Sequence, residues 1–399
     1  MSRRELQAAT SLASIYFMRM LGLFMILPVF ALYAEHLPDS TPLKVGLALG
    51  AYGLTQALLQ IPFGLLSDRI GRKPVIVGGL LLFGGGSVLA AVANSVTVII
   101  IGRALQGAGA IAAAVMAMAA DLTSEQHRTK AMAIIGVSIG FAFLCAFLLG
   151  PVLNAHIGVP GLFWLAAGMA LAAIAILLLW VPTPTRQVAG EEADAAHLGQ
   201  VLRNPVLLRL DLGIALLHLI LTACFVVIPL LLRDQAGLAP ADHWKLYLPV
   251  MLGSVVLMAP AVMIAERRGL LGPFFTASVA LLAASLLGMG LFHGGALGLG
   301  LLMLAFFTAI NFLESCLPSL VSRLAPGHSR GAAMGAYSTA QFLGSFLGGA
   351  LGGWLHGALG EHATLIGTAV LATSWIFLSL GMPAPARKEG EPAPTSPGG

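Results

Sequence analysis

The chain has 399 residues, of which only 10% are Asp, Glu, Lys or Arg, whereas 58% are hydrophobic. An ordinary soluble domain carries about 25% charged residues, so this composition excludes a water-soluble globular protein, and its apolar content excludes a disordered chain. At about 20 apolar residues for each spanning helix, the length allows about twelve helices in a bilayer.

Twelve apolar runs, each long enough for a spanning helix, follow one another along the chain. In chain order they cover residues 10–34, 45–66, 75–94, 98–120, 131–153, 161–181, 206–232, 246–265, 273–292, 297–320, 331–356 and 364–381. Because these runs are long and continuous, they do not fit the short alternating strands of a membrane β-barrel. The sequence therefore predicts an all-α polytopic membrane protein with twelve transmembrane helices.

Polar segments divide the spans into two groups of six. We expect an N-terminal six-helix half at 1–181, a cytoplasmic linker at 182–205, a C-terminal six-helix half at 206–382 and a disordered cytoplasmic tail at 383–399. The loop with Asp68 and Gly71 matches the loop with Glu266 and Gly269 at one shift of 198 residues. Such a duplicated unit is typical of secondary transporters, whose substrate site lies between the halves.

The 21 Lys and Arg residues are distributed unevenly over this topology. The side that holds both chain ends carries 16 of them and the other side 3, while Arg19 and Arg103 lie within spans. Since cytoplasmic loops carry the excess of Lys and Arg, we expect both termini in the cytoplasm of a bacterial-type inner membrane. The net charge of +4 is spread over many segments, so it does not indicate a nucleic-acid partner.

The segment after the second span, GLLSDRIGRKP, is the most specific motif in the chain. Its glycines and charged residues are Gly64, Asp68, Arg69, Gly71, Arg72 and Lys73. A basic loop that only sets the topology explains the Arg and Lys, but not the glycines and the acid at fixed spacing. Gly64 allows helices to approach closely, Gly71 allows a turn with positive φ, and Asp68 can face a helix N-terminus. The pattern therefore indicates a cytoplasmic gating loop.

This segment fills every fixed position of the loop G-x-x-x-D-R-x-G-R-[RK], and the chain therefore resembles the major facilitator superfamily. The resemblance implies the major facilitator fold, with two six-helix halves that work by rocker-switch alternating access. It also implies that Arg72 pairs with Asp121 at the foot of the fourth span. Asp68 would face the start of the eleventh span near Arg330, and these contacts would shut the cytoplasmic side in the outward-open state.

Further stretches resemble the drug:proton antiporters within that superfamily. The fifth span is similar to the antiporter motif G-x-x-x-G-P-x-x-G-G at Gly136, Gly140, Gly150 and Pro151, although Ala146 and Asn154-Ala155 replace glycines of the motif. The surroundings of Arg19 and Glu314 are similar to the YajR branch, whose extra soluble C-terminal domain we do not expect here. The resemblance implies exchange of a substrate for protons.

Ionisable side chains inside the spans are candidates for proton coupling, because each costs at least about 2.5–3.5 kcal/mol to insert. We expect the Glu314 carboxyl to lie buried in an apolar site and to exchange a proton near neutral pH, with a hydrogen-bonded packing acid as the alternative. His218 suits the same task, with a neutral core histidine as the alternative. Arg19 and Arg103 cannot carry protons themselves, but each can hold a carboxylate.

The substrate cavity is expected to combine pliable apolar and a few polar side chains. The candidates are Met25, Tyr33, Phe225, Gln56, Asn311 and Gln341. Methionine and aromatic residues suit promiscuous binding, although the same residues also suit lipid-facing or core positions. Glycines four residues apart, as at Gly46 and Gly50, Gly331 and Gly335, and Gly344, Gly348 and Gly352, allow helices to cross closely.

The sequence thus predicts a monomeric, proton-coupled exporter of small amphipathic molecules, with no cofactor and no enzymatic activity. The alternative is a proton-linked symporter or exporter of sugars or other metabolites on the same fold, which would need more Asn, Gln, Asp and Trp in the membrane than this chain has. A membrane enzyme would need clustered His, Asp and Glu, and a channel would need a continuous polar lining. Neither pattern is present in the sequence.

Overall fold

The computed structural model describes residues 1–183, 199–292, 294–326 and 329–380, and these residues form helices joined by short turns. The helices are α1 (Arg3–Phe24), α2 (Phe30–Ala34), α3 (Pro42–Ile70), α4 (Arg72–Ala91), α5 (Val96–Ala108), α6 (Ala112–Asp121), α7 (Glu125–Leu179), α9 (Pro205–Asp234), the 3-10 turn η1 (Pro240–Asp242), α10 (Trp244–Arg267), α11 (Leu271–Leu291), α12 (Ala296–Leu324) and α13 (Arg330–Ser379). The predicted tail at 383–399 and most of the predicted linker at 182–205 lie outside the described residues. The boundaries of the two halves stay a prediction.

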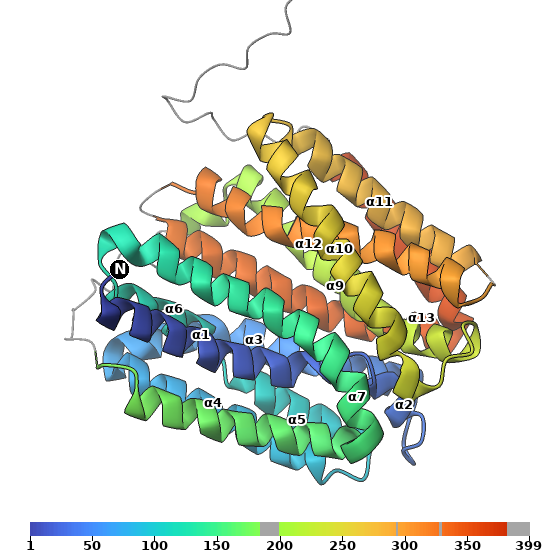
Figure 1. The fold of residues 1–399 in the computed structure, drawn as a ribbon, viewed down its shortest axis with the longest axis horizontal. Coiled ribbons are helices and arrows are strands. Elements are labelled where there is room, and N and C mark those ends of the chain that lie inside the picture. The colour runs from blue at the N-terminus through green and yellow to red at the C-terminus, as the bar shows by residue number, and fades with distance from the viewer. Residues whose placement is uncertain (184–198, 293, 327–328, 381–399) are drawn as a thin grey trace, which may run out of the picture.

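The described helices account for the twelve predicted spans. Within the described ranges, nine helical stretches are long and apolar enough to cross a membrane, with α5 and α6 forming one of them. Two of the nine, α7 and α13, have 55 and 50 residues and are each broken once, at Gly158 with φ 67° and at Gly360 with φ 85°. Each break separates two spans, and α1, which lies along α7, is the remaining span (Figure 1). Glycine at both breaks permits the positive φ that other residues avoid.

Two predicted spans differ from the single helices that we expected. The first span, 10–34, is interrupted by turns between α1 and α2 around Pro28, because proline cannot donate the backbone hydrogen bond that continues a helix. The fourth span, 98–120, breaks between α5 and α6 at Gly109, Ala110 and Ile111. This second break leaves the Gly109 carbonyl without its helical partner, so it is available to side chains from other helices.

Glycine contacts bring α9, α3 and α13 together at backbone distance. Side chains added at Gly344, Gly348 and Gly352 of α13 would overlap the α9 backbone at Ala215, Leu219 and Ala223, respectively. In the same way, a side chain at Gly46 of α3 would overlap the α13 backbone at Gly349. The glycine stripes on α3 and on the middle of α13 therefore serve close helix crossing, as the sequence predicted.

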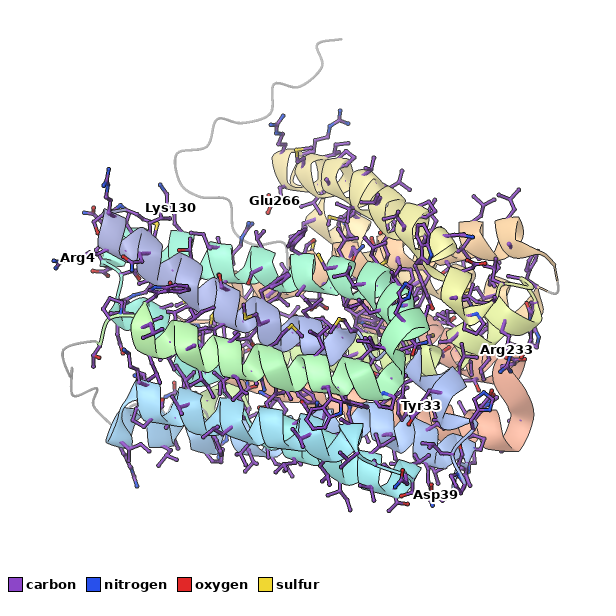
Figure 2. The ribbon with its side chains drawn as sticks, turned by 60° about the horizontal axis from the view of Figure 1, so that its bottom comes forward. Arg4, Tyr33, Asp39, Lys130, Arg233 and Glu266 are labelled. Carbon is purple, nitrogen blue, oxygen red and sulfur yellow. The ribbon has the colours of Figure 1, made fainter. Side chains whose placement is uncertain are left out.

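Charged residues mark the two ends of the bundle. Arg4 and Lys130 lie at one end, called here the N-terminal face, and Asp39 and Arg233 lie at the other, called the opposite face (Figure 2). The Asp39 carboxylate accepts hydrogen bonds from the backbone N–H groups of Val96 and Thr97 at 2.7 and 3.2 Å. Hydrogen bonds from Thr97 and the nearby Lys44 hold the pKa of Asp39 well below its usual range. The first loop of the opposite face is thereby fixed to the start of α5.

The bundle is closed at the opposite face. The ring of Phe147 on α7 lies 5.2 Å from Phe225 on α9, 5.3 Å from Tyr247 on α10 and 5.8 Å from Phe307 on α12, measured between ring centroids. Arg233 at the end of α9 also forms an ion pair with Glu35 after α2. These contacts join elements from both predicted halves, and α7 and α10 approach each other at this end (Figure 1).

Toward the N-terminal face, several glycines meet no neighbour. Side chains added at Gly136 and Gly140 of α7, or at Gly331 and Gly335 of α13, would have no heavy atom within 4 Å. The close helix crossing expected at Gly331 and Gly335 is therefore absent in this conformation. The same helices are thus packed at the opposite face and separated at the N-terminal face.

We predict that Gly348→Leu lowers the stability of the protein, whereas Gly136→Leu does not. The added side chain at Gly348 must displace the α9 backbone, and overpacking of this kind costs about 1–3 kcal/mol. The side chain at Gly136 enters open space. Thermal unfolding of both purified variants in detergent measures the difference, and equal melting temperatures for the two would contradict the packing described here.

Candidate functional site

The candidate site is a polar cluster of Glu314 on α12, His218 on α9 and Gln341 on α13. The Gln341 Nε2 atom lies 3.2 Å from Glu314 Oε1 and 2.9 Å from His218 Nε2. The His218 Nδ1 atom lies 3.9 Å from Glu314 Oε2. The structure therefore brings together the two main candidates for proton coupling and one candidate for the cavity.

The Gln341 amide determines how the other two side chains are oriented. Its N–H group donates to the Glu314 carboxylate, and its contact with His218 Nε2 fits a neutral imidazole that accepts there and carries its proton on Nδ1. That proton then points toward Glu314 Oε2. A second proton taken up by His218 would turn this contact into an ion pair, so the cluster can respond to protonation by changing its internal contacts.

The Glu314 carboxyl is accessible rather than buried in an apolar site, which corrects our expectation. The side chain of Glu314 is 43% exposed, and that of His218 is 16% exposed. The partners of Glu314 come from α9 and α13, so the carboxyl lies where three helices meet. Glu314 is exposed because the helices are separated toward the N-terminal face. The sequence pattern does not show which end of the bundle is open. Access of this kind allows Glu314 to exchange protons.

A further polar contact extends the cluster to α10. Asn311 lies one helical turn before Glu314 on α12, and its Nδ2 atom donates to Ser254 Oγ at 2.9 Å. Residues three apart share a helix face, so Asn311 and Glu314 face the same side of α12. Four helices, α9, α10, α12 and α13, therefore contribute to one polar region.

Arg19 on α1 is held by oxygen atoms of other helices. It is only 2% exposed, and its Nη2 atom donates to Gln56 Oε1 and to the Gly109 carbonyl, both at 2.8 Å. The Gly109 carbonyl is the one released by the break between α5 and α6. The Tyr52 ring lies 5.7 Å from the Arg19 guanidinium carbon, within the range of a cation–π contact.

Arg103 on α5 is held in a similar way on the other side of Tyr52. Its Nε atom donates to the Ala48 carbonyl at 3.2 Å, and its Nη1 atom donates to Gln106 Oε1 at 2.9 Å. Its guanidinium carbon lies 5.4 Å from the centroid of the Tyr52 ring. Among the described residues, no carboxylate pairs with Arg103 or with Arg19. In this conformation the described partners of both arginines are neutral groups, and the role of the arginines in proton coupling stays a prediction.

The gating loop joins α3, α4 and α6. Arg72 forms ion pairs with Asp68 and with Asp121, whose Oδ2 atom lies 3.1 Å from Arg72 Nε. Its Nη1 atom also donates to Ser67 Oγ at 2.7 Å. Gly71 is the N-cap residue directly before α4 and has a φ of 100°, a positive value that glycine adopts readily. The Arg72–Asp121 pair implied by the resemblance is present.

The contact expected between Asp68 and the start of α13 is not present in this conformation. Within the described ranges, no hydrogen bond joins Asp68 to Arg330 or Gly331, and a side chain at Gly331 would meet open space. A side chain at Gly64 would lie 3.2 Å from Ala113 Cβ on α6. The gating role of the motif, including Arg69 and Lys73, stays a prediction.

The antiporter-like residues of α7 fall into two environments. A side chain at Gly150 would lie 2.5 Å from the Met25 carbonyl oxygen, so Gly150 and the adjacent Pro151 are packed against the turn after α1. Gly136 and Gly140 instead border the open region described above. The motif therefore connects the closed end of the bundle to its open end.

Three apolar cavity candidates lie at or near the closed end. Met25 and Phe225 are 0% and 1% exposed. Tyr33 lies close to the opposite face, near Asp39 and Arg233 (Figure 2). In this conformation these side chains contribute to packing, and their role in binding a substrate stays a prediction.

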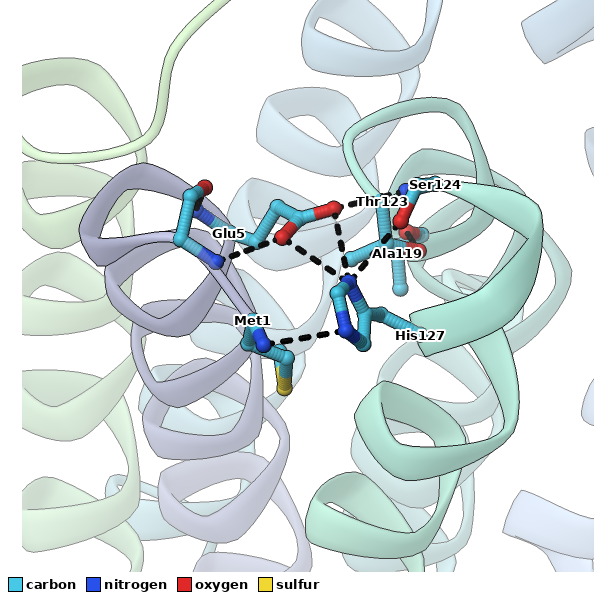
Figure 3. A network of polar contacts seen from close by, with 7 residues as sticks. Met1, Glu5, Ala119, Thr123, Ser124 and His127 are labelled. Atoms are coloured by element: carbon cyan, nitrogen blue, oxygen red, sulfur yellow. Dashed lines mark hydrogen bonds and ion pairs between the residues drawn. The ribbon is translucent and has the colours of Figure 1, made fainter.

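A polar network ties the N-terminus of the chain to the start of α7 (Figure 3). The Met1 amino group lies 3.0 Å from His127 Nε2, and Glu5 Oε1 accepts the backbone N–H of Ser124 at 2.9 Å. Hydrogen bonds from the Ser124 and Ser2 backbones hold the pKa of Glu5 well below its usual range. The carboxylate therefore stays charged at neutral pH and anchors α1 to the N-cap of α7.

Sequence reasoning missed two buried polar residues near the cluster, Asp211 on α9 and Tyr337 on α13. They are 8% and 4% exposed, and neither Asp211 Oδ1 nor the Tyr337 hydroxyl has a hydrogen-bond partner among the residues that the structure describes. Asp211 was visible as an acid inside an apolar run, seven residues before His218 and so on the same helix face.

Comparison with known proteins identifies relatives over nearly the whole chain. The sequence model of the Major Facilitator Superfamily matches residues 12–349 of this chain. The chain is 44% identical to the inner membrane transport protein YajR of Escherichia coli (strain K12) over 387 residues, which cover 96% of this chain and 85% of that protein. It is 29% identical to the multidrug resistance protein MdtH of Aeromonas hydrophila, with 79% of each chain covered.

Solved structures share the fold at low sequence identity. A bacterial homolog of the human lysosomal transporter Spinster, in an inward-facing and occupied conformation, has a TM-score of 0.78 at 13% identity and covers 95% of this chain and 97% of its own. The human organic anion transporter MFSD10 has a TM-score of 0.66 at 19% identity, with 95% of this chain and 100% of that chain covered. At these identities the likeness concerns the fold alone.

We predict that the Arg72–Asp121 ion pair contributes about 0.2–1 kcal/mol of coupling energy, the range for partly exposed pairs. Arg72→Ala, Asp121→Ala and the double variant form a mutant cycle that isolates this contribution in thermal unfolding. A parallel cycle of Arg323 with Glu266, whose side chains are 48% and 47% exposed, is the control and should give a smaller value. Additive effects in the first cycle would show that the pair contributes no stability.

Proposed function

This chain belongs to the Major Facilitator Superfamily, and on that premise we propose that it is a proton-coupled secondary transporter that exports small amphipathic molecules. As a member of the family it is a multi-pass membrane transporter and not an enzyme. The proposal adds the coupling to protons, the export direction and the substrate class. It also places the N-terminal face in the cytoplasm, in keeping with the excess of Lys and Arg at that end.

The cluster of Glu314, His218 and Gln341 is the observation that carries the proposal. It contains two side chains that can bind protons, joined by one neutral amide, and it lies where α9, α12 and α13 meet. A proton that binds here changes the charge of a site to which α9, α12 and α13 all contribute. The free energy of one helix arrangement then changes relative to another, which is the requirement for coupling.

The packing of glycines supports alternating access. Gly46 and Gly349 make the contact between α3 and α13 at the opposite face, whereas Gly136 on α7 and Gly335 on α13 are uncovered toward the N-terminal face. Uncovered small residues on those helices can receive a partner helix if the bundle closes at that end. Closure there would require the Phe147 cluster and the Arg233–Glu35 pair at the opposite face to separate.

A substrate of mixed character suits the side chains at the open region. The polar side chains of the cluster are few, while the buried cores of the same helices consist mainly of aliphatic, methionine and aromatic residues. The relative MdtH is described as a multidrug resistance protein, and the same substrate class is proposed here. A sugar would require many more hydrogen-bonding side chains than Gln341, Asn311 and Gln56 supply.

We predict that Glu314→Gln abolishes proton-driven accumulation of a dye substrate and leaves downhill movement in place. The amide keeps the shape and cannot exchange a proton, so the free energy of the gradient is no longer coupled to transport. A potential of 100 mV is worth about 2.3 kcal/mol per charge, or about fifty-fold in concentration, and this ratio should fall toward one. Proteoliposomes with an imposed gradient and a panel of dyes measure it.

Glu266→Gln is the matched control for that experiment, because Glu266 is an exposed acid paired with Arg323 at the N-terminal face. Its coupling should equal that of the wild type. Unchanged accumulation by Glu314→Gln would overturn the role of Glu314. No proton-linked flux of any dye by the wild-type protein would overturn the proposed function itself.

We also predict that Gly335→Leu slows transport about tenfold or more without loss of thermal stability. In the conformation described here the leucine enters open space, so folding is unaffected. It would obstruct closure at the N-terminal face, and a misfit of about 1.4 kcal/mol in the closed state already corresponds to a factor of ten. Gly85→Leu on α4, which packs against α3, α5, α6 and α7, is the control. Normal transport by Gly335→Leu would contradict the predicted closure.

A further inference from the structure

Asp211 is a buried acid that the proposed function has not used. It lies on α9, is 8% exposed, and its Oδ1 atom has no hydrogen-bond partner. Since α9 ends at Arg233 on the opposite face, its start and Asp211 lie toward the N-terminal face (Figure 2). Seven residues separate Asp211 from His218, which is about 10 Å along the helix axis.

The contact pattern of α9 with α13 determines what Asp211 faces. The facing pairs recur every four residues, and they are Ala215 with Gly344, Leu219 with Gly348, and Ala223 with Gly352. One step further toward the N-terminal face places Asp211 opposite Ala340. Tyr337 lies three residues before Ala340 and four residues before Gln341 on α13, so it shares a helix face with each of them. Asp211 thus lies on the side of α9 that also borders the Glu314 cluster.

Tyr337 connects Asp211 to the cluster. Its side chain is 4% exposed, its hydroxyl has no hydrogen-bond partner, and it lies within electrostatic range of both Asp211 and Glu314. A buried hydroxyl and a buried carboxyl oxygen without partners are rare in folded proteins. The Tyr337 hydroxyl could donate a hydrogen bond to Asp211, but this conformation does not form that bond.

The surroundings of Asp211 favour a protonated carboxyl in this conformation. Tyr337 from α13 lies within electrostatic range of Asp211 and of Glu314 from α12, and the helix of Asp211 itself carries Arg209 and His218. No described cation forms an ion pair with Asp211. An ionised carboxylate without a partner is costly in apolar surroundings, so the neutral form is favoured until a donor approaches.

We propose that Asp211 is a second proton-binding site of the transporter, coupled to Glu314 through the Tyr337 hydroxyl. When the bundle closes at the N-terminal face, Asp211 gives its proton to Tyr337 Oη while the Tyr337 hydroxyl proton passes to the Glu314 carboxylate. Tyrosine is unchanged, and one proton has moved between the two acids; the reverse transfer returns it. This inference rests on the proposed function only in that the same protons drive export.

Infrared difference spectroscopy of the full chain in lipid, titrated with pH, tests the proposal without a substrate. Protonated carboxyl groups give a C=O signal that is resolved from that of carboxylates. In the wild type we expect two coupled carboxyl signals. Asp211→Asn should remove one and shift the midpoint of the other, and Glu314→Gln should do the reciprocal. Unchanged signals in Asp211→Asn would overturn the proposal.

Tyr337→Phe keeps both acids and the fold and removes only the hydroxyl. We expect both carboxyl signals to remain while the effect of one acid on the midpoint of the other is at least halved. Independent titration of the two acids in the wild type, or a Tyr337→Phe titration equal to that of the wild type, would overturn the coupling through Tyr337. The spectra are independent of flux, so a wild type without proton-linked transport would refute the proposed function while the proton site is judged separately.

Discussion

Helices α9 and α13 touch backbone to backbone, and this contact positions most of the polar residues in the second part of the chain. It exists because Gly344 and Gly348 have no side chain to keep the helices apart. If a side chain held the two helices apart, Gln341 on α13 would move away from His218 on α9. The cluster would then lose the amide that joins its two acid–base groups. In lipid, where apolar side chains gain little by leaving their surroundings, such close packing is one of the few forces that can hold helices at fixed positions.

Charge in the membrane is arranged differently in the two parts of the chain. The first part contains two arginines, Arg19 and Arg103, whose donors are directed at carbonyl and amide oxygens. The second part contains two acids, Glu314 and Asp211, and no described Lys or Arg forms an ion pair with either of them. Fixed positive charges therefore occupy one part and titratable negative charges the other. Closing the bundle at the N-terminal face would bring these unlike charges nearer, and protonation of the acids would weaken that attraction.

Much of this architecture could be predicted from the sequence, because the determinants are local. Span number follows from apolar length, and the Arg72–Asp121 pair followed from a motif with fixed spacing. Glu314, His218 and Gln341 could be chosen individually, but their meeting depends on how three distant helices pack. The exposure of Glu314 could not be predicted, because it depends on which end of the bundle is open. The break at Pro28 follows from the proline in the first apolar run. Asp211 also stands out in the sequence, as an acid inside the seventh apolar run.

The joints at Gly158 and Gly360 have a consequence for how the protein is made. Each joint consists of one glycine with positive φ between two spans, so almost no chain remains outside the bilayer at the opposite face. The first span of each pair therefore has no loop long enough to let it insert before the second span. The fifth and sixth spans must therefore enter the membrane together as one helical hairpin, and so must the eleventh and twelfth. The insertion machinery has to accommodate both helices of such a pair before either one is released into lipid.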